Sequence, residues 1–239
     1  MQTESNKITI LGDSIMKGVF YNPCSSSLRD RYILSSDPIP TRCSRSLGIE
    51  CVNLGRFGST IVQGVEQLNR NSVTISNSKY TLLEFGGNDS DYDWQAIAHL
   101  PQQQHSPHTP LQIYKDTYRY AIRKIREAGS EPVVLTLPPL DAERYFQFFT
   151  MNMTLEEKGN ILKWLGGSIS TISMGHELFN IETIKLAYSE RVSVIDITSA
   201  FLSIRNMSVF FCQDGIHPNE SGQALIAEKI IEAFSAKVM

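Results

Sequence analysis

The chain has 239 residues, 41% of them hydrophobic, and a formal net charge of −3 at pH 7. This length fits a single domain spanning 1–239, and the hydrophobic fraction is sufficient for one buried core. No run of Lys or Arg interrupts the weakly acidic sequence, which argues against nucleic acid or an anionic membrane surface as a partner.

The first residues are polar and lack the pattern of a secretion signal, and no stretch approaches 18 apolar residues, so no membrane insertion is expected. The four cysteines contain no CxxC pair, which is typical of reduced, mostly buried thiols in a cytoplasmic protein: Cys24, Cys43, Cys51 and Cys212. The alternative, a secreted disulfide protein, requires that a signal was removed.

Short apolar segments, each followed by turn-forming residues, predict five strands: Lys7–Leu11, Glu50–Leu54, Tyr80–Phe85, Pro132–Leu137 and Val192–Ile197. Longer patterned stretches between and after them predict helices: Leu111–Ala128, Leu155–Leu165, Ile181–Ser189 and Glu220–Phe234. Strands that alternate with helices predict an α/β fold whose parallel sheet is covered on both faces.

The first predicted strand runs into the sequence ILGDSIMKG at positions 10–18. Gly12 allows a sharp turn at the end of the strand, and Ser14 opens the next helix. A serine there most often caps the helix, but it is also well placed to be a nucleophile. Asp13 is expected to bond to nearby backbone and hold the turn.

The next two strands end in glycine-rich loops, NLGRFGST (53–60) and EFGGND (84–89). Each alone is typical of a plain turn. At the carboxyl edge of a parallel sheet, however, the backbone N–H of Gly58 and the side-chain amide of Asn88 could point into the crevice where such sheets place ligands.

Residues 88–110 form a long polar segment rich in Pro, Gln and His, predicted to be a loop and a lid-like insertion over this edge. The aromatic residues Trp94, Trp164 and the run ERYFQFF (143–149) are expected in the core or the lid. That run follows the fourth strand at its carboxyl end, so part of it could line an acyl or sugar pocket.

Metal sites are weakly supported. The sequence DSDYD lacks the glycine and closing glutamate of a calcium loop, and His105 and His108, with His99 nearby, have no Cys or acid at zinc-ligand spacing. Neither a metal nor a cofactor is therefore expected. Cys212 is interpreted as a small apolar group rather than a nucleophile.

The loop CQDGIHPN (212–219) places Asp214 and His217 three residues apart around a glycine. The turn allows the carboxylate of Asp214 to reach Nδ1 of His217, leaving Nε2 to face Ser14. A hydroxyl nucleophile needs such a base and orienting acid. The backbone N–H groups of Ser14 and Gly58 and the amide of Asn88 are suitable donors for an oxyanion.

Together, Gly12-Asp13-Ser14, Gly58, Gly86-Gly87-Asn88-Asp89 and Asp214-Gly215-Ile216-His217 closely resemble the four sequence blocks of the SGNH (GDSL-type) hydrolase superfamily. The resemblance spans residues 8 to about 235. It implies a flavodoxin-like, three-layer α/β/α fold with a five-stranded parallel sheet. It also implies metal-free ester hydrolysis through an acyl-enzyme, with Ser14, Gly58, Asn88, Asp214 and His217 as the catalytic set.

The expected function is hydrolysis of small or medium acyl esters, with removal of acetyl groups from carbohydrate as one form of it. A lipase, a thioesterase or a lysophospholipase of the same family remains an alternative. A non-catalytic binding protein with this fold is a further alternative, but the complete set of nucleophile, base, acid and oxyanion donors argues against it. The sequence does not indicate an oligomeric state.

Overall fold

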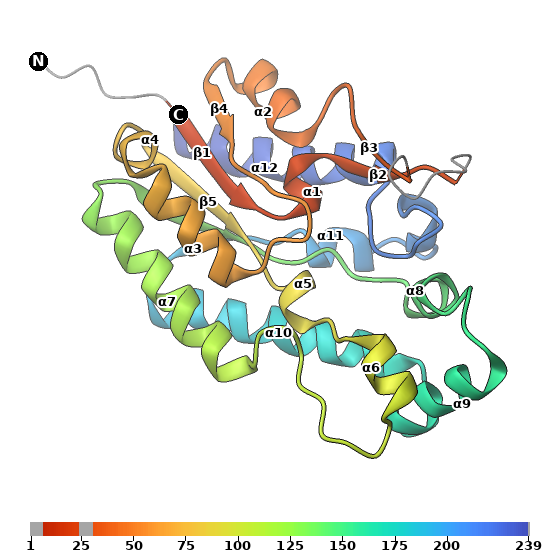
Figure 1. Ribbon diagram of the computed structural model, residues 1–239. Coiled ribbons are helices and arrows are strands. Elements are labelled where there is room, and N and C mark those ends of the chain that lie inside the picture. Colours follow the sequence, from red (N-terminus) through yellow and green to blue (C-terminus); the bar gives the residue numbers. More distant parts are fainter. Residues whose placement is uncertain (1–6, 24–30, 239) are drawn as a thin grey trace, which may run out of the picture.

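The computed structural model describes residues 7–23 and 31–238 (Figure 1). At its centre is a parallel sheet with strand order β4-β1-β5-β6-β7. The bounds are β1 (Lys7–Gly12), β4 (Glu50–Asn53), β5 (Tyr80–Glu84), β6 (Glu131–Leu135) and β7 (Ser193–Ile195). If the five strands of this sheet are numbered in chain order, the order is 2-1-3-4-5. This is the flavodoxin-like order, in which ligands bind beyond the carboxyl edge of the sheet.

All five predicted strands are present, with ends that lie within two residues of the prediction. A separate antiparallel hairpin was not predicted; it consists of β2 (Val19–Tyr21) and β3 (Tyr32–Leu34). Its strands are only three residues long, too short for a periodic pattern to identify.

Helices cover both faces of the sheet, which confirms the three-layer α/β/α fold (Figure 1). Alternate strand residues face opposite layers. Leu82 and Val133 belong to the apolar core on one side, while Leu83 and Val134 belong to the core on the other. The helical layer that covers the face with Leu82 and Val133 contains α2 (Ile39–Leu47), α11 (Thr198–Leu202) and α12 (Glu220–Val238). The second layer, on the other face, contains α3 (Ile61–Arg70), α4 (Ser72–Ser76), α7 (Leu111–Glu127) and α10 (Ser170–Ser189).

A third apolar cluster lies beyond the carboxyl ends of the strands and includes Trp94, Tyr145, Ile161 and Ile172. The helices that build this region are α5 (Gly87–Ser90), α6 (Trp94–His99), α8 (Ala142–Phe149) and α9 (Leu155–Trp164), together with the start of α10 (Figure 1). This cluster forms a wall opposite the sheet edge.

Residues 88–110 are therefore not the continuous loop predicted from their polarity, because they contain most of α5 and all of α6. The side chain of Asp93 caps α6 by accepting from the N–H of Ala96 (2.9 Å), and Trp94 and Ile97 are buried. The short apolar segment of α6 packs against α9, so the helix is stabilised by tertiary contacts and not by a long amphipathic pattern.

The predicted helices over 111–128, 155–165 and 220–234 are confirmed as α7, α9 and α12. The prediction over 181–189 covers only the second half of α10, which begins at Ser170. Two shorter elements complete the set within residues 7–23 and 31–238, α1 (Ser14–Lys17) and the 3₁₀ helix Met207–Phe210.

Among the described residues, no helix is both long and apolar enough to cross a membrane. Cys43, Cys51 and Cys212 are free thiols, and burial raises the pKa of Cys43 to about 12 and that of Cys212 to about 11. Cys24 lies outside the described residues.

Candidate active site

Ser14 is the first residue of α1, directly after β1. The side chain of Asp13 caps this helix, since its Oδ1 accepts a hydrogen bond from the N–H of Ile15 at 2.8 Å. This confirms the local backbone contact expected of Asp13. Only glycine fits at position 12, because a Cβ there would lie 2.6 Å from Cγ of Met16 and 3.1 Å from Oε2 of Glu84.

The loop before α12 brings Asp214 and His217 to Ser14. Nε2 of His217 lies 3.0 Å from Oγ of Ser14, and Nδ1 lies 2.6 Å from Oδ2 of Asp214. Oδ1 of Asp214 accepts from the backbone N–H groups of Ile216 (3.2 Å) and His217 (3.1 Å). The side chains of Ser14, His217 and Asp214 are all buried.

Gly215 sets the shape of this loop. Its φ of +77° lies in the left-handed region, and a Cβ would lie 2.6 Å from both the carbonyl oxygen of Asp141 and the backbone nitrogen of Tyr145. The N–H of Asp141 also donates to the carbonyl of Gly215 at 2.8 Å. The loop is thereby held against the start of α8, which fixes the position of His217 relative to Ser14.

This arrangement is chemically that of an activated hydroxyl. A carboxylate at Nδ1 keeps a proton on that nitrogen, which leaves Nε2 as an acceptor for the hydroxyl proton of Ser14. The serine oxygen can then attack an electrophilic carbon while the imidazole takes its proton.

Two aromatic rings lie against His217, and neither was predicted from the sequence. The ring centroid of Tyr32 is 5.1 Å from that of His217, and Phe57 stacks nearly parallel to the imidazole at 6.2 Å. Burial, followed by the charge of Asp214, raises the pKa of Tyr32 above its usual value, so this phenol stays neutral. Phe57 adjoins Gly58 in the loop after β4, and this adjacency is the one signal in the sequence that could have pointed to it.

The two other predicted site residues lie beside this centre. Gly58 is exposed, with φ of +67°, and no hydrogen bond from its N–H is made to the described residues. The amide Nδ2 of Asn88 donates to Oδ2 of Asp13 at 2.8 Å and to the carbonyl of Ser59 at 3.3 Å. Asp13 therefore connects the start of α1, which its side chain caps, to the side-chain amide of Asn88.

The buried carboxyl group of Glu84 lies next to Asp13, whose backbone N–H donates to it at 3.4 Å. Glu84, at the end of β5, is fully buried and pairs in register with Gly12 of β1. Burial, followed by the charge of Asp13, raises the pKa of Glu84 well above its usual value, and burial raises that of Asp13 to about 6. Two adjacent buried charges are costly, so this pair consists of a protonated Glu84 and an ionised Asp13. Glu84 was not predicted as a site residue, although an acid inside an apolar strand was a signal for it.

Asp89 joins the site to the second helical layer. Both of its carboxylate oxygens accept from the N–H of Ile61, the first residue of α3, at 3.1 Å. Burial raises the pKa of Asp89 to about 7. The helix N-terminus favours the anion, so Asp89 acts as a cap that fixes α3 beside Asn88.

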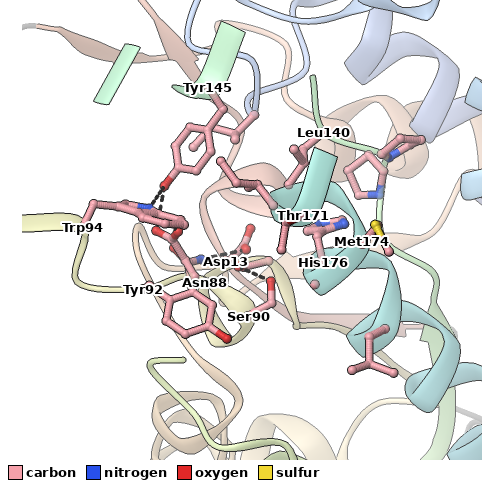
Figure 2. A pocket seen from close by; sticks show the side chains of 18 of the residues that line it. Asp13, Asn88, Ser90, Tyr92, Trp94, Leu140, Tyr145, Thr171, Met174 and His176 are labelled. Carbon is pink, nitrogen blue, oxygen red and sulfur yellow. Dashed lines mark hydrogen bonds between the residues drawn. The ribbon is translucent and has the colours of Figure 1, made fainter. Parts of the chain in front are cut away.

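A cavity of about 460 Å³ opens next to Ser14 and His217. Figure 2 shows Trp94 and Tyr145 on one side of it and His176, Thr171 and Met174, which project from α10, on the other. Tyr145 and Trp94 both donate to Asp91, at 2.7 and 2.8 Å. Tyr145 and Trp164 were predicted to lie in a core, a lid or a pocket. Nothing in the sequence indicated that the first half of α10 would line the cavity.

The histidines considered as zinc ligands lie apart from a metal-like cluster. His105 contacts the carbonyl of Leu100, His108 contacts the carbonyl of Asn88, and His99 contacts Glu157. The described part of the chain contains no group of three His, Cys, Asp or Glu side chains arranged to hold a metal ion.

Comparison with known proteins identifies the family of this chain. The family model for GDSL-like Lipase/Acylhydrolase matches residues 8–230, nearly the whole chain. The chain belongs to this family. As a GDSL-like acylhydrolase it is a carboxylic ester hydrolase.

Solved structures of similar fold are distant in sequence. A lipase/acylhydrolase from Enterococcus faecalis is 18% identical with a TM-score of 0.60, covering 97% of this chain and 96% of the other. A catalytic mutant of an acetylxylan esterase from Geobacillus stearothermophilus is 15% identical with a TM-score of 0.65, covering 97% and 95%. Among the curated proteins compared with this GDSL-like hydrolase, none matches it.

Proposed function

We propose that the protein is a serine esterase that hydrolyses small or medium acyl esters through an acyl-enzyme on Ser14. The observation that carries the proposal is the continuous line of contacts from Ser14 Oγ to His217 (3.0 Å) and on to Asp214 (2.6 Å). Ester hydrolysis is the chemistry of the family, and a serine activated in this way is the group that such chemistry requires.

In the first half-reaction, Oγ of Ser14 forms a bond to the ester carbonyl carbon while Nε2 of His217 takes the hydroxyl proton. The tetrahedral intermediate then loses the alcohol, which leaves with the proton from His217. In the second half-reaction, water attacks the acyl-serine while His217 takes a proton from it. His217 then returns this proton to Oγ of Ser14 as the bond between Oγ and the carbonyl carbon breaks and the carboxylic acid leaves. Asp214 holds the imidazole and stabilises its charged form without taking the proton.

The negative oxygen of the intermediate is held by the backbone N–H groups of Ser14 and Gly58 and by the amide of Asn88. The position of Ser14 in the first turn of α1 supports this, because N–H groups at a helix start are free to bind an anion. The amide of Asn88 becomes available by giving up its longer contact, the 3.3 Å bond to the carbonyl of Ser59.

The cavity favours an uncharged substrate group of modest size. Apolar and aromatic side chains dominate its wall, while Asp13 and Asp91 would repel an anion there. Acetylxylan esterases among the structural neighbours favour removal of acetyl groups from carbohydrate as a specific form of this activity. A lipase, thioesterase or lysophospholipase is the alternative within the family, and residues 88–110 would act as the lid over the cavity.

The proposed reaction uses no cofactor and no metal, and its partner is a small-molecule ester. The unpaired thiols of Cys43, Cys51 and Cys212 favour a reducing compartment, and a cytoplasmic location remains a prediction.

Ser14→Ala tests the proposal. We expect the variant to hydrolyse 4-nitrophenyl acetate with a kcat lower by about 10⁴-fold or more, and to lose any burst of 4-nitrophenol. The matched control is Ser203→Ala, which removes an exposed hydroxyl that bonds only to the carbonyl of Ala200. Near-normal turnover by Ser14→Ala would contradict a serine esterase. A panel of acyl lengths, with acetylated xylose added, separates the substrate classes.

A further inference from the structure

His176 is a buried polar side chain that the proposed reaction does not use. It lies in the first half of α10 with 8% of its surface exposed, and it lines the cavity that contains Ser14. Burial lowers its pKa to about 4, so the imidazole is neutral at physiological pH. A neutral imidazole has one N–H donor and one nitrogen acceptor.

Neither ring nitrogen of His176 makes a hydrogen bond to any of the residues described. Other buried polar side chains of α10 are satisfied. Asn180 accepts from the N–H of Leu137 at 2.9 Å and donates to Thr198, and Thr183 donates to the carbonyl of Phe179 at 2.8 Å. Among the described residues, fully buried side-chain atoms without a partner occur in Asp37, Glu84 and Gln223 but not in His176. The ring nitrogens of His176 are therefore accessible, and a group bound in the cavity can pair with them.

The position of His176 in the cavity wall indicates the partner. Its neighbours in the wall are largely apolar, among them Leu165, Ile172 and Leu140, and they offer no alternative hydrogen bond. Asp13 and Asp91 line the same cavity, which disfavours an anionic ligand group. A neutral hydroxyl can donate or accept, and so it can pair with either nitrogen of the imidazole, whichever of the two carries the proton.

We infer that His176 is a specificity-determining residue that hydrogen-bonds a hydroxyl group on the ester bound in the cavity. The inference rests on the proposed esterase function. It means that the substrate carries a hydroxyl in the part that occupies the cavity. An ester with a methyl group there would leave the buried imidazole unpaired, and a site of this kind rejects the apolar analogue more strongly than a purely apolar pocket rejects a hydroxyl.

Matched ester pairs that exchange a methyl group for a hydroxyl test this inference. One pair, propyl butanoate and 2-hydroxyethyl butanoate, places the hydroxyl on the alcohol part. The other, methyl heptanoate and methyl 6-hydroxyhexanoate, places it on the acyl part. We expect the ratio of kcat/KM, hydroxyl ester over methyl ester, to be about 10- to 100-fold higher for the wild type than for His176→Phe in at least one pair.

Three variants make the result specific. His176→Gln keeps one donor and one acceptor and should restore part of the ratio, while His176→Leu is a second, smaller apolar replacement if the phenylalanine variant does not fold. Ser173→Ala is the matched control, because it removes a polar group of α10 that bonds to the carbonyl of Ser170 and does not line the cavity. It should keep the wild-type ratio.

Equal ratios in the wild type and the apolar His176 variants, in both pairs, would overturn the inference. A loss of the ratio in Ser173→Ala equal to that in His176→Phe would also overturn it, because the effect would not come from the cavity. Failure of the proposed function gives a different result: Ser14→Ala would hydrolyse these esters as fast as the wild type, whatever the ratios.

Discussion

Asp214 contacts His217 through both carboxylate oxygens, Oδ2 at the ring Nδ1 and Oδ1 at the backbone N–H. The second contact orients the loop, and the first determines which ring nitrogen carries the proton. The variant Asp214→Asn separates these two tasks. The oxygen of the asparagine amide can still accept a hydrogen bond from the backbone N–H of His217, whereas the amide NH₂ group donates to Nδ1, where the carboxylate accepted.

We expect Asp214→Asn to fold normally and to lose about 10³- to 10⁴-fold in kcat, because Nε2 then carries the proton and cannot accept one from Ser14. Steady-state hydrolysis of 4-nitrophenyl acetate measures the loss, and circular dichroism checks the fold. Asp196→Asn is the control, since that exposed acid follows β7 and contacts Ser199 rather than the site. If Asp214→Asn keeps most of its activity, Asp214 only ties down the loop.

Helix α3 packs on the sheet through a glycine. A Cβ at Gly64 would overlap the ring of Phe85, with Cε2 at 2.8 Å and Cζ nearer still. Phe85 follows β5 directly and precedes the turn that carries Asn88. The close approach of α3 thus holds the chain just before the candidate oxyanion donor.

Gly64→Ala should lower the free energy of unfolding by about 1–3 kcal/mol, because the overpacking outweighs the higher helix propensity of alanine. The same change in α9, Gly159→Ala, is the matched control. That glycine is exposed and a Cβ added to it would meet nothing within 4 Å, so the protein should gain up to about 1 kcal/mol. Urea unfolding of both variants measures the two effects, and a gain at Gly64 would refute tight packing there.

Across the whole molecule, buried acids make stability depend on pH. Glu84 has a raised pKa in the folded state, so above its ordinary value of 4.5 the folded protein holds a proton that the unfolded chain releases. The free energy of unfolding therefore falls as the pH rises above 4.5. Asp13 and Asp89, with pKa values of about 6 and about 7, act in the same direction. His176 acts oppositely between about 4 and 6.5, where only the unfolded chain gains the proton.

Comparing Glu84→Gln with the wild type cancels the contribution of His176. We expect the urea midpoint of the variant, relative to the wild type, to rise steadily between about pH 5 and pH 8, because glutamine needs no proton to stay neutral. Glu66→Gln, an exposed partner of Arg70, should show no such trend. A difference between Glu84→Gln and the wild type that does not change with pH would mean that Glu84 does not titrate in this way.

The sequence by itself determined the strands of the sheet and their alternation with helices. Residues such as Ile8, Leu82 and Val133 lie in short apolar runs that end in turn-forming residues, and such local signals identify buried strands without any tertiary information. Because parallel strands end at one edge, the order of strand exits also predicted that Ser14, Asn88 and His217 would gather there.

Only the tertiary structure decided what surrounds them. Glu84 is visible in the sequence only as an acid at the end of an apolar strand, and His176 looks ordinary there, as a histidine within a helix. Their raised and lowered pKa values arise from burial, which depends on packing between segments far apart in the chain. The cavity wall of α6, α8, α9 and α10 has the same origin, because short helices are stabilised by the surfaces they cover rather than by their own sequence pattern.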